Sequence, residues 1–194
     1  MKALLAAAAL AAATPASAQS LPDAFAALSA QASAVHADFA RLQARPGFAM
    51  KGASQDGGAA PDFSARTVDG RLTFLSDYRG RVVVLDFWAS WSAACRGTVP
   101  QRAALAANGG VAVLGVAVGE SADSARAFAA SVGGADGETV LTDPDRTIFG
   151  AFSGQALPLA VVVDRQGAVV AAVSGSGPDA EARIEAAVQT ALAR

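Results

Sequence analysis

Apolar residues follow two patterns that alternate along this chain. Residues 82–88 and 111–118 are nearly continuous apolar runs, as in strands that are buried on both faces of a sheet. Each run is followed by a segment that opens with Ser, a favoured helix N-cap, and continues with a helical pattern, from 92 to about 107 and from 121 to about 132. The pattern therefore predicts two strand–helix units, with Ser92 just past the first strand.

The last part of the chain predicts a hairpin and a closing helix. Residues 159–164 and 168–173 read as two antiparallel strands joined by a turn at Arg165-Gln166-Gly167. Apolar residues on one face predict a helix over 178–192. Strand, helix, strand, helix, hairpin and helix in this order predict the α/β class, a sandwich with a mixed central sheet flanked by helices.

A further helix is predicted ahead of these units. Between residues 22 and 44 the larger apolar residues recur at alternating spacings of three and four, which lines one helical face. We expect an amphipathic helix over 19–46, a linker over 47–59 and the main domain over 60–194. The apolar face either docks on the chain's own domain or pairs two chains as a homodimer.

The first eighteen residues have the pattern of a secretory signal peptide. Lys2 precedes an apolar stretch over 3–13, and small residues stand before Gln19. We therefore expect export to the periplasm, with cleavage after Ala18. No Cys stands at the cleavage site to carry a lipid, and the later apolar runs are short, so no stable membrane anchor is expected.

Composition narrows the chemistry. Of the 194 residues 53% are hydrophobic and 16% charged, and the formal net charge is −2 without a basic run, which argues against nucleic-acid binding. One Cys and one His supply neither a disulfide framework nor a Cys/His metal site. We therefore expect no metal and no cofactor.

Residues 86–96 gather the candidate chemistry, because a strand end, two Trp residues and the single Cys lie within eleven residues. The segment resembles the thioredoxin superfamily active site, in which Trp-Cys-x-x-Cys opens a helix and Pro stands five residues after the second Cys. Pro100 stands five residues after Cys95. The flanking sequence is similar to the exported TlpA-like branch, among the redoxins related to AhpC-TSA. This likeness is carried by residues 60–63, 68–70, 75–83, 115–121, 157–158 and 163–167.

The resemblance implies roles for individual positions. Cys95 matches the second, resolving cysteine, and Asp86 matches the buried acid that can accept or relay its proton. Pro158 matches the cis-proline that faces the cysteines. Trp91, Leu157 and Pro158 match the groove in which a substrate polypeptide lies.

Ser92 stands where the family has its first, attacking cysteine. A serine hydroxyl cannot form the mixed disulfide, so the ordinary dithiol cycle is closed. Cys95 could act alone in monothiol redox or antioxidant chemistry, because Ser-x-x-Cys also matches part of the peroxiredoxin pattern. Alternatively, the chain is a non-catalytic module that binds periplasmic proteins with thiols or disulfides, or small thiols. A third hypothesis is that the serine was introduced to silence an active enzyme. The family resemblance favours an oxidoreductase.

Overall fold

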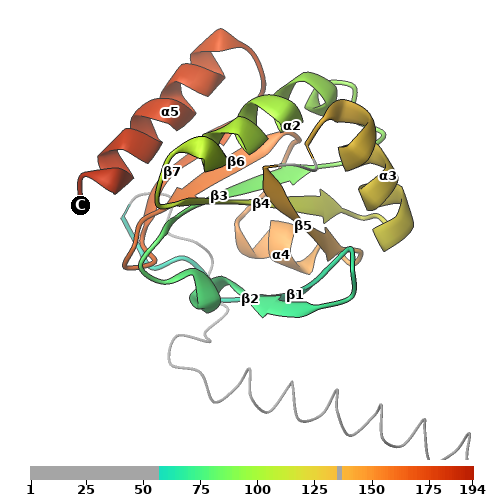
Figure 1. Ribbon diagram of the computed structural model, residues 1–194, viewed down its shortest axis with the longest axis horizontal. Helices are drawn as coiled ribbons and strands as arrows, with labels where there is room; N and C mark the ends of the chain where they lie inside the picture. The colour runs from blue at the N-terminus through green and yellow to red at the C-terminus, as the bar shows by residue number, and fades with distance from the viewer. Residues whose placement is uncertain (1–56, 135–136) are drawn as a thin grey trace, which may run out of the picture. The chain divides into compact units, whose positions relative to one another are not determined.

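Seven strands form one mixed sheet in the computed structural model, which describes residues 57–134 and 137–194 (Figure 1). The strands are β1 (Ser64–Thr67), β2 (Leu72–Phe74), β3 (Val82–Trp88), β4 (Val111–Val118), β5 (Glu138–Asp143), β6 (Leu159–Val163) and β7 (Val169–Ser174). The helices are α2 (Cys95–Ala103), α3 (Ala122–Val132), α4 (Thr147–Ala151) and α5 (Pro178–Leu192), with 3₁₀ helices η1 (Leu75–Tyr78) and η2 (Ala104–Ala107). The predicted α/β class with a mixed sheet is therefore confirmed.

The two central strands are the two apolar runs of the sequence. The spatial order is β2-β1-β5-β4-β3-β6-β7, in which β3, β4 and β5 are parallel and the other pairs antiparallel. Every residue of β3 and β4 is buried. Helices and loops cover both faces of these strands, which is why neither strand shows an alternating pattern.

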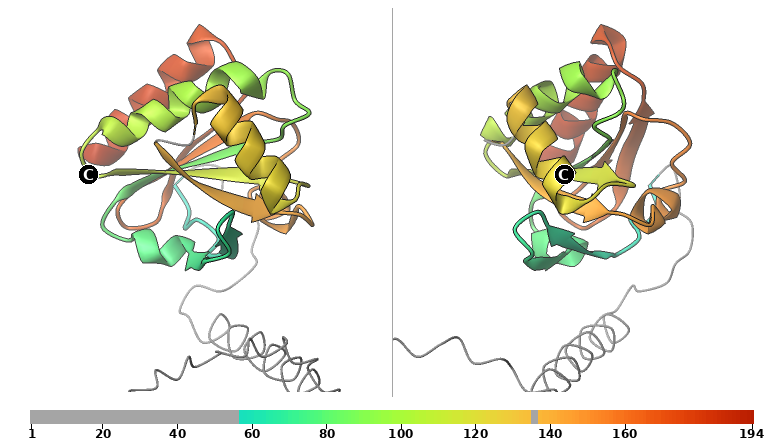
Figure 2. Two further views of the ribbon diagram at one scale, coloured as in Figure 1. Left: turned by 45° about the vertical axis from the view of Figure 1, so that its right-hand side comes forward. Right: turned by 90° about the vertical axis from the view of Figure 1, so that its right-hand side faces the viewer.

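The two faces of the sheet have different covers. Helices α2, α3 and α5 lie on one face, whereas α4 and η1 lie on the other (Figures 1 and 2). Alternate residues of β3 divide between them: Val82, Val84 and Trp88 face α2, α3 and α5, and Leu85 and Phe87 face the opposite cluster. Asp86 shares the parity of Val84 and therefore lies on the α2 face.

Most predicted elements are confirmed within a residue or two. Ser121 caps α3 by accepting a hydrogen bond from the Ser124 amide at 3.2 Å, and β6 and β7 form the predicted antiparallel hairpin. The helix expected to open at Ser92 begins instead at Cys95, with Ala94 as its N-cap and no side-chain cap. Ser92 lies in a turn before the helix, so the prediction that it caps the helix is wrong.

Three strands and one α-helix, besides the 3₁₀ helix η1, escaped the pattern of apolar positions. Strands β1 and β2 have four and three residues, and α4 has five, which is too short for a periodicity to emerge. Strand β5 has apolar residues at only two of its six positions, Val140 and Leu141. Short or mixed elements of this kind take their conformation from sheet pairing rather than from their own sequence.

The end of the predicted linker joins the sheet. The Gly57 amide donates to the Val169 carbonyl at 3.1 Å, and Ala59 forms a bridge with Ala168. The predicted signal peptide, the amphipathic helix and the rest of the linker lie outside the described residues. No helix in the described part of the chain is long and apolar enough to cross a membrane.

Candidate functional site

The loop after β3 presents one aromatic side chain to solvent. Within it the Ser92 amide donates to the Ala89 carbonyl at 3.0 Å, and the Cys95 amide donates to the Ser92 carbonyl at the same distance. These two four-residue turns separate the strand from α2. They leave the Trp91 side chain 64% exposed and Ser92 half-buried.

Leu157 and Pro158 lie at the same end of the sheet as this loop. Strand β6 pairs with β3 so that Leu159 lies opposite Phe87, one residue before the end of β3. The two residues before β6 are therefore close to the point where β3 passes into its loop. The Leu157–Pro158 peptide bond is cis, as the resemblance implies, with Pro158 buried and Leu157 half-buried.

Cys95 is the first residue of α2 and is completely buried as a free thiol. Its side chain belongs to an apolar cluster with Trp88 and Phe128, whose rings lie 5.1 Å apart between centroids. The Arg96 guanidinium lies 5.4 Å from the centre of the Phe128 ring and covers this cluster from outside. Solvent therefore does not reach the sulfur in this conformation.

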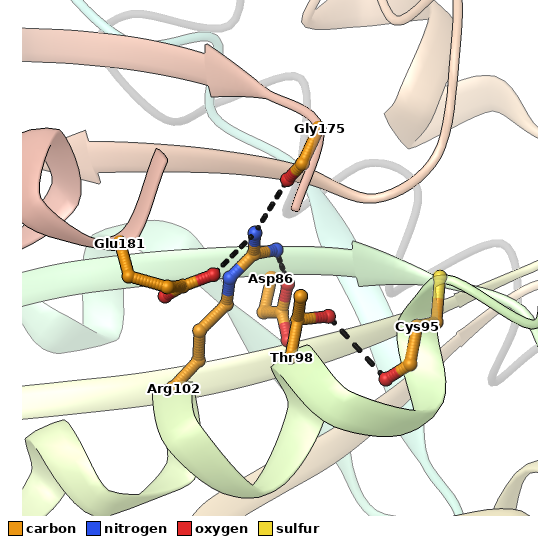
Figure 3. Close-up of polar contacts among 6 residues, drawn as sticks. All are labelled: Asp86, Cys95, Thr98, Arg102, Gly175 and Glu181. Atoms are coloured by element: carbon orange, nitrogen blue, oxygen red, sulfur yellow. Dashed lines mark hydrogen bonds and ion pairs between the residues drawn. The ribbon is translucent and has the colours of Figure 1, made fainter. Parts of the chain in front are cut away.

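Asp86 is held by a buried arginine. Residues 95, 98 and 102 follow one another along the inner face of α2, which brings the Arg102 guanidinium onto Asp86 Oδ1 (Figure 3). Arg102 also donates to the Gly175 carbonyl at 3.1 Å and to Glu181 Oε1 at 3.3 Å. No hydrogen bond joins Asp86 to Cys95 among the described residues, so the structure brings Asp86 beneath α2 but directs one of its oxygens to Arg102.

Burial dominates the protonation of this acid. Desolvation raises the pKa of Asp86 from its usual value to about 6, even though the Arg102 charge and hydrogen bond lower it. Desolvation alone would lower the pKa of Arg102, but the charge and hydrogen bond of Asp86, followed by Glu181, raise it overall. Asp86 and Arg102 therefore form a buried ion pair above about pH 6.

Two further carboxylates near the site were not predicted. Glu120, which follows β4, is buried and accepts hydrogen bonds from the Ser90 amide at 2.7 Å and the Ser90 hydroxyl at 2.6 Å. The sequence could have indicated this position, because Glu120 follows the strand that runs parallel to β3 and so lies at the same edge of the sheet. Glu138 begins β5, and both its carboxyl oxygens are buried without a partner among the described residues. No pattern in the sequence distinguished Glu138 from a surface acid.

A further buried acid, Asp143, has a structural role. Asp143 accepts hydrogen bonds from the amides of Ile148 and Phe149 at 3.1 and 2.8 Å and so caps α4. In residues 57–134 and 137–194 no cluster of three or more His, Cys, Asp or Glu side chains could hold a metal ion.

Comparison with known proteins places this geometry in a family. The AhpC/TSA family model matches residues 57–172. Thiol-disulfide oxidoreductase ResA of Bacillus subtilis is 32% identical over 132 residues, which covers 66% of this chain and 73% of ResA. A solved structure assigned as the thiol:disulfide interchange protein DsbE from Chlorobium tepidum is 32% identical with a TM-score of 0.64, covering 71% of this chain and 97% of that protein.

A second solved structure, the pneumococcal exposed lipoprotein thioredoxin from Streptococcus pneumoniae, is 28% identical with a TM-score of 0.55 and covers 66% of this chain and 98% of that protein. These likenesses extend over the sheet and its helices, which form a thioredoxin-like fold. The family model spans more than half of the chain, including the loop after β3 and the Leu157–Pro158 step. The chain therefore belongs to the AhpC/TSA family, within its thioredoxin-like thiol-disulfide oxidoreductases.

Proposed function

We propose that this chain binds extended polypeptides, without a covalent step, in a groove formed by Trp91, Ser92 and the Leu157–Pro158 step. The observation that carries the proposal is the contrast in exposure after β3, where Trp91 is 64% exposed and Cys95 is fully buried. An exposed indole is a favoured anchor for a partner. A sulfur out of reach of solvent does not attack a disulfide, and the Ser92 hydroxyl cannot form one.

The backbone beside the groove supports binding by strand addition. Leu157 precedes β6, and its backbone makes no hydrogen bond to the rest of the described chain. An extended segment can therefore pair with it and place side chains against Trp91. The family points to the class of partner: polypeptides of the periplasm that contain thiols or disulfides, or small thiols.

Calorimetric titration with short synthetic peptides tests this proposal. Each peptide carries one cysteine, either as the thiol or as a mixed disulfide with glutathione. Saturable binding is expected for the unsubstituted protein and for Cys95→Ala, and binding about tenfold weaker for Trp91→Ala, as for the loss of an interface anchor. Gln189→Ala, an exposed change on α5, serves as the matched control. Equal binding by the Trp91→Ala protein, or no binding at all, contradicts the proposal.

The position of Cys95 favours monothiol chemistry as a second candidate. Cys95 begins a nine-residue helix, and the helix N-terminus stabilises a thiolate. In this hypothesis the Cys95 thiolate attacks a disulfide, forms a mixed disulfide and releases one thiolate, and an external thiol then displaces the bound half and restores Cys95. Because Cys95 is buried, the start of α2 has to move before the attack.

A chromogenic aromatic disulfide distinguishes the two candidates, because its attack by a thiolate releases a coloured thiolate. Monothiol chemistry predicts colour release from the folded protein at a rate well above that of its unfolding, followed by recovery of Cys95 on addition of glutathione. The binding proposal predicts release only as fast as the protein unfolds. The Cys95→Ala variant gives the background rate.

Export is part of the proposal. The Lys2 and apolar pattern before Gln19 supports a cleaved signal peptide, and one solved relative is described as an exposed lipoprotein. Mass spectrometry of the protein from a periplasmic extract should find Gln19 as the first residue. A mature protein that retains Met1 contradicts export by this route.

A further inference from the structure

Three neighbouring strands place two carboxyl groups on either side of a glycine. Asp86 of β3 pairs with Gly115 of β4, and Glu138 of β5, whose register partner is Val113, extends its carboxyl group over Gly115 from the other side. A Cβ atom at position 115 would lie 2.5 Å from Glu138 Oε2 and 2.7 Å from Oε1. The Glu138 carboxyl group therefore fills the space that the missing side chain leaves above β4, on the side of Asp86.

The polar partners available here satisfy one carboxylate only. Arg102 contacts Asp86 Oδ1, whereas Asp86 Oδ2 and both oxygens of Glu138 are buried without a partner among the described residues. The wall opposite is apolar and close: a Cβ atom at Gly134 would lie 2.5 Å from Val99 and 3.2 Å from Glu138 Oε1. Two buried negative charges with one cation are far less stable than one.

We propose that Glu138 is a positioning residue for Asp86. Glu138 holds a proton beneath α2, so that Asp86 carries the only negative charge of the pair and keeps that charge on Arg102. This inference goes beyond the proposed function, because it concerns the charge beneath the site whether the chain binds partners or reacts with them. The glycine at 115 is what allows the arrangement.

The other charged groups around Glu138 do not provide a counter-ion. From α5, Glu181 reaches the pair only through Arg102. Outside, Asp69, Arg71 and Arg126 border a cleft of about 310 Å³ that Glu138 also lines. In the described residues no ion pair joins Glu138 to these groups, and Arg126 contacts Asp69 and Asp123 instead.

The protonation of the two acids agrees with this geometry. Burial, and to a smaller extent the negative charge of Asp86, together raise the pKa of Glu138 to about 9. Asp86, which has the cation, loses its proton first, at about pH 6. The two acids therefore titrate in two steps that belong to the pair.

Carbon-13 NMR of protein labelled at the Asp and Glu carboxyl groups tests the assignment on the full mature domain. A protonated carboxyl signal is expected near neutral pH, absent in Glu138→Gln and present in Asp86→Asn. Its titration midpoint in Asp86→Asn should fall by about one pH unit, because the neighbouring charge is gone. Glu185→Gln, a substitution at an exposed position of α5, should change neither the protonated carboxyl signal nor its titration midpoint.

Two results would overturn the inference: no protonated carboxyl near neutral pH, or a Glu138 midpoint that Asp86→Asn leaves unchanged. Where Asp86→Asn does not fold, Glu138→Gln still decides. Asp86 loses its proton while Glu138 is neutral, so its midpoint in Glu138→Gln should stay near 6. An Asp86 midpoint that moves by a unit or more in Glu138→Gln would show that the proton does not reside on Glu138.

Discussion

Replacing Glu138 with Gln should make the protein more stable, increasingly so as the pH rises. The pKa of Glu138 is about 9 in the folded protein and 4.5 without the fold, so folding takes up a proton between these values. Because the folded state binds more protons, the free energy of unfolding falls with rising pH across this window. Gln keeps the shape and a neutral polar group but binds no proton.

The size of the effect follows from the pKa difference. Each unit of difference corresponds to about 1.4 kcal/mol, so the proton uptake by Glu138 costs the folded state about 3 kcal/mol at pH 7. Between pH 5 and pH 8 the advantage of Glu138→Gln over the unsubstituted protein should grow by about 4 kcal/mol. Asp86 adds its own slope below pH 6, but both proteins share it, and the difference between them isolates Glu138.

Urea unfolding of both proteins at several pH values measures this difference. Glu185→Gln controls for the removal of one surface charge. Its free energy of unfolding should differ from that of the unsubstituted protein by the same amount at every pH. If the stability difference between Glu138→Gln and the unsubstituted protein is also the same at every pH, Glu138 is ionised in the folded protein and the buried neutral acid does not exist.

Three other substitutions test separate parts of the site. Arg102→Met leaves Asp86 buried without its cation, so it should destabilise by about 3–5 kcal/mol in chemical unfolding and move the Asp86 midpoint above 6; an unchanged midpoint would contradict the ion pair. Glu120→Ala removes two hydrogen bonds to the loop after β3 and should cost about 2 kcal/mol, with weaker peptide binding; unaltered stability would mean the loop holds itself. Ser92→Cys should form a disulfide with Cys95 under mild oxidation, seen by mass spectrometry as the loss of two hydrogens, unlike Ser92→Ala; two free thiols after oxidation would mean the two positions are not apposed.

The sequence predicted the centre of the fold because burial on both faces leaves a mark that needs no partner to interpret. Strands 82–88 and 111–118 were located to the residue for this reason. The start of α2 was misplaced, because the turn hydrogen bonds of Ser92 and Cys95 delay a helix that Ser at an N-cap would otherwise favour. Turns of this kind are set by the point at which the strand leaves the sheet and by how the following helix packs on it.

The candidate site was predicted where the family resemblance covers it, in the segment after β3 and at the Leu157–Pro158 step. Arg102 lies seven residues after Cys95 on the same buried face of the helix. The sequence shows this charge, but its role can be recognised only once Asp86 is known to lie opposite it. Glu138 could not be predicted, because its burial depends on the absence of a side chain at Gly115 in a neighbouring strand. Such contacts across strands follow from register, which the sequence of one strand does not specify.

The rate at which Cys95 is alkylated in the folded protein, compared with its rate in denaturant, shows whether this site can carry out thiol chemistry. We expect the thiol, buried in the cluster of Trp88 and Phe128, to react only as the protein unfolds, while peptide binding through Trp91 persists. Rapid alkylation of the folded protein would contradict this expectation, because the sulfur would then be accessible and the chemistry of the site would return to Cys95.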